Sequence, residues 1–144
     1  MSASTKLSSS VKALCFLAES FPTPKTSKEI AENTGLNASK LRKLLSLLSK
    51  NNIVYSSQGT KGGFQLLKSP KDIHLQEIYC SIEDRKAFHL NVSEIVGEDK
   101  YDFPGYFQAL FASIQVDIEK KMTKIPLQAV MDYLNIKSNY KIKK

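Results

Sequence analysis

The sequence has no long apolar run and only two cysteines, and both shortages narrow the classes of protein that it can encode. A helix that crosses a bilayer needs about 18 consecutive apolar residues, and no stretch of the chain approaches that length. The Ser-rich N-terminus lacks the apolar segment and cleavage site of a signal peptide, so we expect a cytoplasmic protein without a membrane partner. Cys15 and Cys80 both fall within apolar helical patterns and form no CxxC pair, which disfavours a disulfide framework.

Motifs of catalysis and metal binding are also missing. The chain has no glycine-rich phosphate loop and no HExxH or GxSxG motif. Its sequence also indicates no pair of a catalytic nucleophile and a base. Its two histidines, His74 and His89, have no third ligand near them in the sequence, which argues against zinc. We therefore expect a protein that is not an enzyme and holds no metal ion.

The net positive charge lies in only one half of the chain. The net charge is +7, and residues 1–68 carry ten basic against three acidic side chains, whereas residues 69–144 carry eleven of each. The whole excess therefore lies in the first half, which would attract a polyanion to one end of the molecule and leave the other end for protein contacts. A basic surface that binds nothing is the alternative.

The segment from residue 37 to residue 50 has the periodicity of an amphipathic helix. Four leucines at intervals of three and four residues predict its buried stripe: Leu41, Leu44, Leu45 and Leu48. The opposite face holds basic and hydroxyl side chains and no acidic ones: Ser39, Arg42, Lys43, Ser46 and Lys50. Asn37 is a predicted N-cap, so the positive end of the helix dipole would face a ligand such as a phosphate.

A hairpin is predicted directly after this helix. Residues 53–57 form an extended apolar run, residues 58–63 include three glycines, and residues 64–67 return as a second extended run. A basic-faced helix followed by a glycine-rich basic hairpin is typical of a winged helix-turn-helix that contacts DNA.

Two helices are predicted before the basic one. The first spans residues 8–20 and ends at the prolines 22 and 24. The second spans residues 27–34, where Thr26 and Glu29 have the spacing of a capping box and Gly35 supplies the turn into the next helix.

These patterns predict a mainly α protein with a small β-hairpin wing and four successive regions. Residues 1–82 would form the winged helix-turn-helix, and residues 83–103 an acidic connecting loop that is a candidate sensor region. Residues 104–135 would form dimerisation helices, and residues 136–144 a disordered basic tail.

The long helix predicted near residues 104–123 has an apolar stripe longer than one small domain readily covers. Its six candidate dimerisation residues are Phe107, Leu110, Phe111, Ile114, Ile118 and Met122. A core helix packed within one chain is the alternative.

Four segments together resemble the bacterial Rrf-two (Rrf2) family of transcriptional regulators: LSSSVKALCFLAE, TSKEIAENTGLNASKLRKLLSLLSKNNIVYS, QGTKGGFQLLKSPKDIHLQEIY and IPLQAVMDYL. The resemblance implies a homodimeric winged-helix regulator that binds double-stranded DNA at an operator of two related half-sites. Its dimer would form through the long helix, with the first helix packing against the partner.

The resemblance also implies candidate DNA-binding residues. They lie at the start of the second helix, on the helix of residues 37–50 and in the wing of residues 58–63: Thr26, Ser27, Asn37, Ser39, Lys40, Arg42, Lys43, Gln58, Thr60 and Lys61. Gln58 stands where the family often has an arginine for the minor groove.

The chain departs from the cluster-binding members of this family, which carry three closely spaced cysteines in the loop before the long helix. Residues 84–106 contain no cysteine, and iron–sulfur clusters are held mainly by thiolates, so we expect no cluster. A mixed cysteine and histidine site across a dimer is the alternative.

Our preferred hypothesis is a transcriptional regulator, and specifically a repressor, whose effector the sequence does not identify. Two further hypotheses stay open: a winged-helix module that binds another protein, and a thiol-based redox regulator that uses Cys15 or Cys80.

Overall fold

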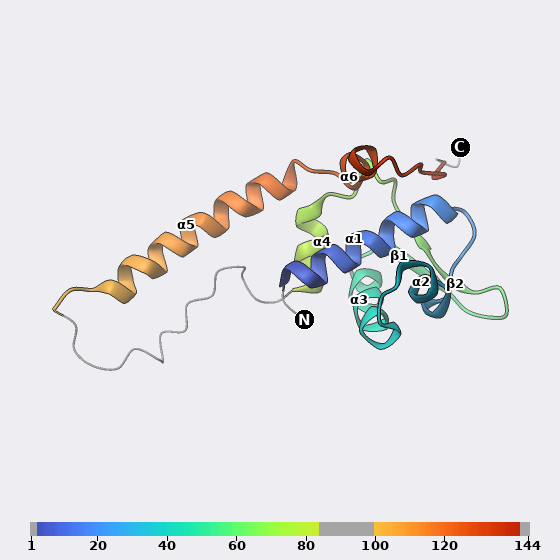
Figure 1. The fold of residues 1–144 in the computed structure, drawn as a ribbon, viewed down its shortest axis with the longest axis horizontal. Helices are drawn as coiled ribbons and strands as arrows, with labels where there is room; N and C mark the ends of the chain where they lie inside the picture. The colour runs from blue at the N-terminus through green and yellow to red at the C-terminus, as the bar shows by residue number, and fades with distance from the viewer. Residues whose placement is uncertain (1–2, 84–99, 142–144) are drawn as a thin grey trace.

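The computed structural model describes residues 3–83 and 100–141, which form six helices and one two-stranded hairpin. In chain order the elements are α1 (Ala3–Ser20), α2 (Ser27–Thr34), α3 (Ala38–Lys50), β1 (Val54–Ser57), β2 (Gly63–Leu66), α4 (Leu75–Ile82), α5 (Phe103–Thr123) and α6 (Leu127–Leu134). Helix α1 runs through the middle of the compact part, from which α5 projects (Figure 1). The predicted mainly α fold with a small hairpin wing is confirmed.

Local capping fixes the start and the end of α2. The Thr26 hydroxyl accepts a hydrogen bond from the Glu29 N–H, and the Glu29 carboxylate accepts one from the Thr26 N–H, both at 3.1 Å. Gly35 ends the helix with a φ of 75°, in the left-handed region that favours glycine. The capping box and the helix bounds predicted from the sequence are both confirmed.

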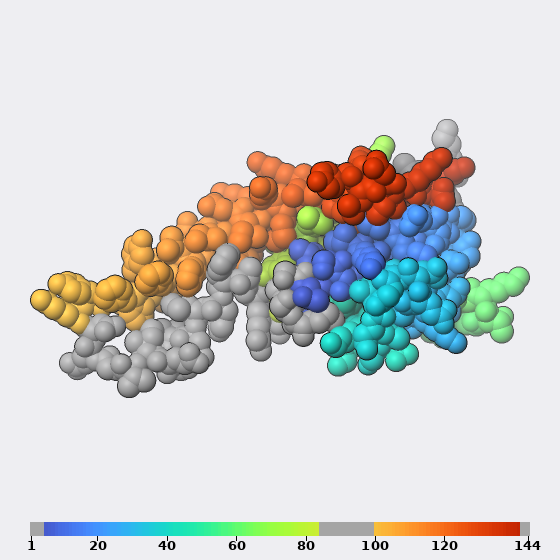
Figure 2. Space-filling view, viewed as in Figure 1, coloured from blue at the N-terminus to red at the C-terminus, as the bar shows by residue number. Residues whose placement is uncertain are grey.

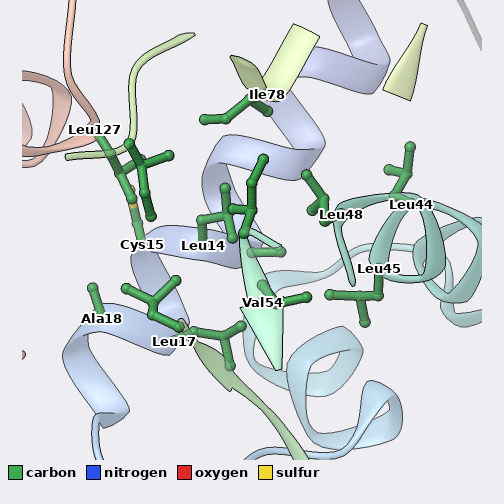
Figure 3. Close-up of a cluster of buried hydrophobic side chains, with 14 of the residues drawn as sticks. Leu14, Cys15, Leu17, Ala18, Leu44, Leu45, Leu48, Val54, Ile78 and Leu127 are labelled. Carbon is green, nitrogen blue, oxygen red and sulfur yellow. The ribbon is translucent and has the colours of Figure 1, made fainter. Parts of the chain in front are cut away.

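One apolar core joins the helix-turn-helix to the other elements. Leu41, Leu45 and Leu48 of α3 are almost fully buried, which confirms the predicted stripe. Figure 3 shows α3 leucines beside Leu14 and Leu17 of α1, with further contributions from β1, α4 and α6. Because α3 is held by this buried face, its opposite face is fixed in orientation toward solvent.

The wing also pairs with a residue outside the hairpin, through an isolated bridge that local patterns did not predict. Strands β1 and β2 pair antiparallel, with Val54 opposite Leu66 and Ser57 opposite Gly63. On the other edge of β2, the Phe64 N–H donates to the Lys25 carbonyl at 2.7 Å, and the Lys25 N–H donates back at 3.0 Å. The wing is therefore tied to the residue that precedes the cap of α2.

Helix α5 is attached to the compact part through its C-terminal half. Beyond α5, the Leu127 N–H donates to the Ile73 carbonyl at 2.6 Å, and the Leu75 N–H donates to the Ile125 carbonyl at 2.9 Å. The N-terminal half extends away from the remaining helices (Figures 1 and 2). No helix in residues 3–83 and 100–141 combines the length and the apolar composition that a bilayer crossing requires.

Both ends of the chain differ from expectation. Helix α1 begins at Ala3 rather than near residue 8, because Leu7 continues the face that packs on the core. The prediction of a disordered tail is wrong for residues 136–141, where Ile136 and Tyr140 pack against the core. Residues 84–99, which make up most of the predicted acidic loop, and residues 142–144 lie outside the described residues.

Candidate nucleic-acid interface

Helix α3 presents its N-terminus outward. The Asn37 side chain accepts a hydrogen bond from the Lys40 N–H at 3.0 Å, so the predicted N-cap is confirmed. In an α-helix the preceding N–H groups, here those of Ala38 and Ser39, have no partner within the helix and carry the positive end of its dipole. This end of α3 is therefore suited to an anionic group such as a phosphate.

The candidate DNA-binding residues occupy three neighbouring places on the surface. They are the start of α2, the first turns of α3 and the hairpin tip, which lie on one side of the molecule with α2 between α3 and the tip (Figure 1). Nine of the ten side chains are exposed, and Ser27 is half-buried. Arg42 and Lys43 point to solvent, as a role in binding requires.

The basic side chains of α3 and the wing tip form no ion pair with any other described residue. Within the described residues the ion pairs join Lys6 to Glu83, Lys25 to Glu29 and Lys68 to Glu77, at 3.4, 3.8 and 2.7 Å. None of them involves the basic residues of α3 or of the wing tip: Lys40, Arg42, Lys43 and Lys61. The basic residues of α3 and the wing tip therefore keep their positive charge, as do exposed residues elsewhere such as Lys120.

Thr26 caps α2 and is also exposed at the candidate interface. Its backbone N–H and its hydroxyl both bond Glu29, and these hydrogen bonds, the backbone one most of all, lower the pKa of the Glu29 carboxyl. Glu29 stays ionised and pairs with Lys25 at 3.8 Å, which leaves the exposed Lys28 as the unpaired charge in the first turn of α2. Any DNA contact of Thr26 would therefore be a neutral hydrogen bond from its hydroxyl.

Glycine at position 63 allows the wing to approach the start of the helix-turn-helix. Gly63 has a positive φ of 151°, and a Cβ built there would lie 2.6 to 2.9 Å from backbone atoms of Lys25. The tip beyond it is closed by a hydrogen bond from the Gly62 N–H to the Gly59 carbonyl at 3.0 Å. This close approach holds Gln58, Thr60 and Lys61 at a fixed place beside α2.

Replacing Gly63 with alanine is expected to destabilise the wing. The new methyl group would collide with the Lys25 backbone, and overpacking of this kind costs about 1–3 kcal/mol of unfolding free energy. Urea unfolding measures this loss, and Thr60→Ala at the exposed tip is the matched control, expected to change stability by less than about 0.5 kcal/mol. Equal stability of the two variants would show that β2 does not need this close approach.

The two cysteines lie in different environments. Cys15 is 4% exposed, and burial, with a smaller contribution from Glu19, raises the pKa of its thiol to about 11. Cys80 is exposed and accepts a hydrogen bond from the Gln76 side chain at 3.1 Å. The expectation that Cys80 belongs to the apolar pattern of its helix is therefore wrong. Since the thiolate is the reactive form, Cys15 is the poorer candidate for redox sensing.

A thiol-reactive reagent at neutral pH is expected to label Cys80 rapidly and Cys15 only after unfolding. Cys80→Ser should remove the rapid phase, whereas Cys15→Ser should leave it intact. Loss of the rapid phase in Cys15→Ser would contradict the assigned environments.

The neutral thiol of Cys15 stabilises the fold below pH 9.0, its ordinary pKa, and this contribution is lost as the pH rises through about 11.

His74 has a structural role. Its Nδ1 accepts a hydrogen bond from the Glu77 N–H at 3.3 Å, which caps α4. His89 falls outside the described residues. Within residues 3–83 and 100–141 no group of three His, Cys, Asp or Glu side chains is arranged to hold a metal ion.

Comparison with known proteins relates this chain to one family of regulators. The model of the Rrf2 family, described as an iron-dependent transcriptional regulator, matches residues 3–133, which is most of the chain. The chain belongs to the Rrf2 family. Members of this family are DNA-binding transcriptional regulators, and the chain is accordingly a DNA-binding regulator and not an enzyme.

Individual Rrf2 relatives agree with the family match. YwgB of Bacillus subtilis, an HTH-type transcriptional regulator by its assigned name, is 30% identical over 111 residues, 74% of this chain and 69% of YwgB. YwnA of the same organism is 32% identical over 114 residues, 76% of this chain and 84% of YwnA. The structure of T. potens IscR has a TM-score of 0.68 and 28% identity, covering 90% of this chain and 85% of IscR.

CymR, the global cysteine regulator of B. subtilis, shares the Rrf2 fold at a TM-score of 0.66. It is 23% identical, and the match covers 90% of this chain and 95% of CymR. This likeness shows the fold alone.

The residues of this Rrf2 chain do not fit an iron–sulfur cluster. The sequence has two cysteines and two histidines, whereas such clusters are usually held by four thiolates. Cys15 is enclosed in the core, and Cys80 lies exposed on α4. The thiols of one protomer therefore supply no cluster site.

Proposed function

We propose that this Rrf2 chain binds, as a homodimer, an operator of two related half-sites and represses transcription from it. The observation that supports this most is the group of exposed basic residues on α3 and the wing, none of which is paired within the described residues. Repression requires no contact beyond the operator, because a dimer seated on a promoter excludes polymerase.

On DNA, α3 would enter the major groove with its N-terminal turns foremost. Arg42 would bond the O6 and N7 atoms of a guanine, and Lys43 would contact the backbone. At the wing, Lys61 and Thr60 would contact phosphates, and Gln58 would reach the minor-groove edge of the bases as a hydrogen-bonding group without charge.

Dimerisation would cover apolar surface that one chain leaves open. Near the N-terminal end of α5, Phe103 and Tyr106 are 56% and 64% exposed, and Phe107 and Leu110 are also exposed. The other four predicted dimerisation residues are only partly buried: Phe111, Ile114, Ile118 and Met122. A continuous apolar face of this kind marks an interaction site, and two-fold homodimers are the commonest assemblies.

Helix α1 offers a second apolar surface for the partner. A hollow of about 660 Å³ between α1 and α6 is lined mainly by apolar side chains, including Leu7, Val11 and Leu134. This supports the arrangement in which the first helix packs against the second copy.

We also propose that the dimer works without an iron–sulfur cluster. After anaerobic treatment with iron and sulfide, the protein is expected to show no visible absorption bands that depend on its cysteines. Bands that appear in the wild type and disappear in Cys15→Ser or Cys80→Ser would overturn this proposal.

Selection from random duplexes tests the function as a whole. The chain is expected to enrich one sequence with two related halves, and to bind it more tightly than a scrambled duplex at every salt concentration. Both affinities should fall by orders of magnitude as salt rises, because phosphate contacts release counterions. Absence of any preferred sequence would instead favour a winged-helix module whose ligand is another protein.

A further inference from the structure

The C-terminal segment of residues 136–141 crosses the end of α1. Asn135 ends α6 in the left-handed conformation, and the Ile136 N–H donates to the Met131 carbonyl at 2.8 Å. The chain then reaches α1, where the Asn139 N–H donates to the Ala18 carbonyl at 2.9 Å. The Asn139 side-chain amide donates to the carbonyl of Glu19. One residue thus occupies two of the carbonyls that the last turn of a helix leaves without partners.

Tyr140 continues this contact into the segment that links α1 to α2. Its ring packs on the ring of Phe21, with 4.5 Å between the centroids. Four residues after Phe21, Lys25 pairs with Phe64 of the wing, and Thr26 caps α2. The C-terminal segment therefore contacts the start of residues 21–26, the connection whose later residues bond the wing and cap α2.

We propose that Asn139 and Tyr140 are positioning residues for DNA binding, which set the angle at which α3 and the wing of each protomer meet the duplex. The inference rests on the proposed function, because it needs a dimer on two half-sites. Helix α6 follows α5, the helix that carries the proposed dimer face. The segment of residues 136–141 thus links the dimerisation helices to the C-terminal end of α1. This link is separate from the one at residues 125–127, which bond to residues 73 and 75.

The angle matters because two half-sites are read at once. When a dimer reads DNA, the spacing of its recognition helices must match the spacing of the half-sites. A protomer whose helix-turn-helix rotates more freely against the dimerisation helices would still read one half-site. It would tolerate a wrong spacing better and bind the right spacing less tightly.

The test compares operators that differ only in spacing. The duplex selected by the wild type, and versions with base pairs inserted between the half-sites, would be titrated with full-length variants. Asn139→Ala/Tyr140→Ala removes the contact, and Tyr140→Phe keeps the ring that packs on Phe21. Tyr133→Ala is the matched control, since Tyr133 is a neighbouring aromatic residue that is 86% exposed on α6.

The double variant is expected to bind the selected operator about tenfold more weakly and to lose most of the discrimination between spacings. Tyr140→Phe and Tyr133→Ala should keep the wild-type ratio between the two affinities. Hydrogen exchange at the backbone amides between α1 and α2, those of Phe21, Thr23, Lys25 and Thr26, should rise in the double variant alone.

A double variant with a lower melting temperature and an unchanged spacing ratio would overturn the inference, because the segment would then only stabilise the fold. A wild-type chain that binds no two-part operator would instead refute the proposed function itself. The two failures are therefore distinguishable in one set of titrations.

Discussion

Arg42→Ala is expected to relax the sequence preference of the protein more than it weakens binding to DNA in general. An arginine that bonds a guanine with both of its terminal nitrogens contributes about 1–3 kcal/mol of discrimination, or roughly 5- to 150-fold. Arg42 is exposed on α3 behind a capped N-terminus and takes part in none of the ion pairs among the described residues. Titrations of the selected operator and of a scrambled duplex measure both effects.

Two further variants separate base reading from charge. Lys61→Ala at the wing tip should weaken binding to all sequences alike and reduce the salt dependence by about one counterion, as expected for a phosphate contact. Lys120→Ala removes an exposed charge of the same sign from the last turn of α5 and should change neither quantity. An equal loss on both duplexes for Arg42→Ala would refute its role in reading bases.

If the chain forms the dimer proposed here, Phe107→Glu is expected to be a monomer at concentrations where the wild type is a dimer. Phe107 is 39% exposed, so covering it contributes only part of the about 1.5–3 kcal/mol of a fully buried phenylalanine, and two-fold symmetry doubles that part. The two carboxylates that replace the rings would also lose hydration without gaining a partner, which adds to the loss. Sedimentation equilibrium measures the change. Operator affinity should fall with it, since two half-sites would then be bound independently.

Val116→Glu is the matched control on the same helix. Val116 is 47% exposed and lies nine residues after Phe107, about half a turn around α5 at 100° per residue. The control should remain dimeric and bind the operator normally. If Val116→Glu dissociates the protein and Phe107→Glu does not, the dimer uses the other face of α5.

The helix-turn-helix could be predicted from the sequence because its signals are local. Asn37, and Thr26 with Glu29, cap their own helices within three residues, and the leucine spacing of α3 fixes which face is buried. The exposed face of the candidate interface follows from that burial without any knowledge of the other elements. Its assignment to DNA contacts stays a prediction.

Features that depend on distant contacts were not predictable. The pairing of Lys25 with Phe64 joins residues far apart in sequence, and the residues around Lys25 have no strand pattern that would predict it. The packing of Tyr140 on Phe21 similarly spans almost the whole chain, so the composition of the C-terminal segment alone favoured disorder. Cys80 differs, because the buried residues Ile78, Tyr79 and Ile82 of α4 follow a spacing that already excludes it.

Amide hydrogen exchange with and without the selected operator tests the central claim most directly, because it locates the surface that DNA covers. Operator binding is expected to slow exchange at residues 37–43, from the N-cap into the first turns of α3, and at residues 58–63 of the wing. The scrambled duplex should protect these residues less at the same salt concentration. Protection that falls on α5 or α6 instead, with α3 and the wing unchanged, would contradict it.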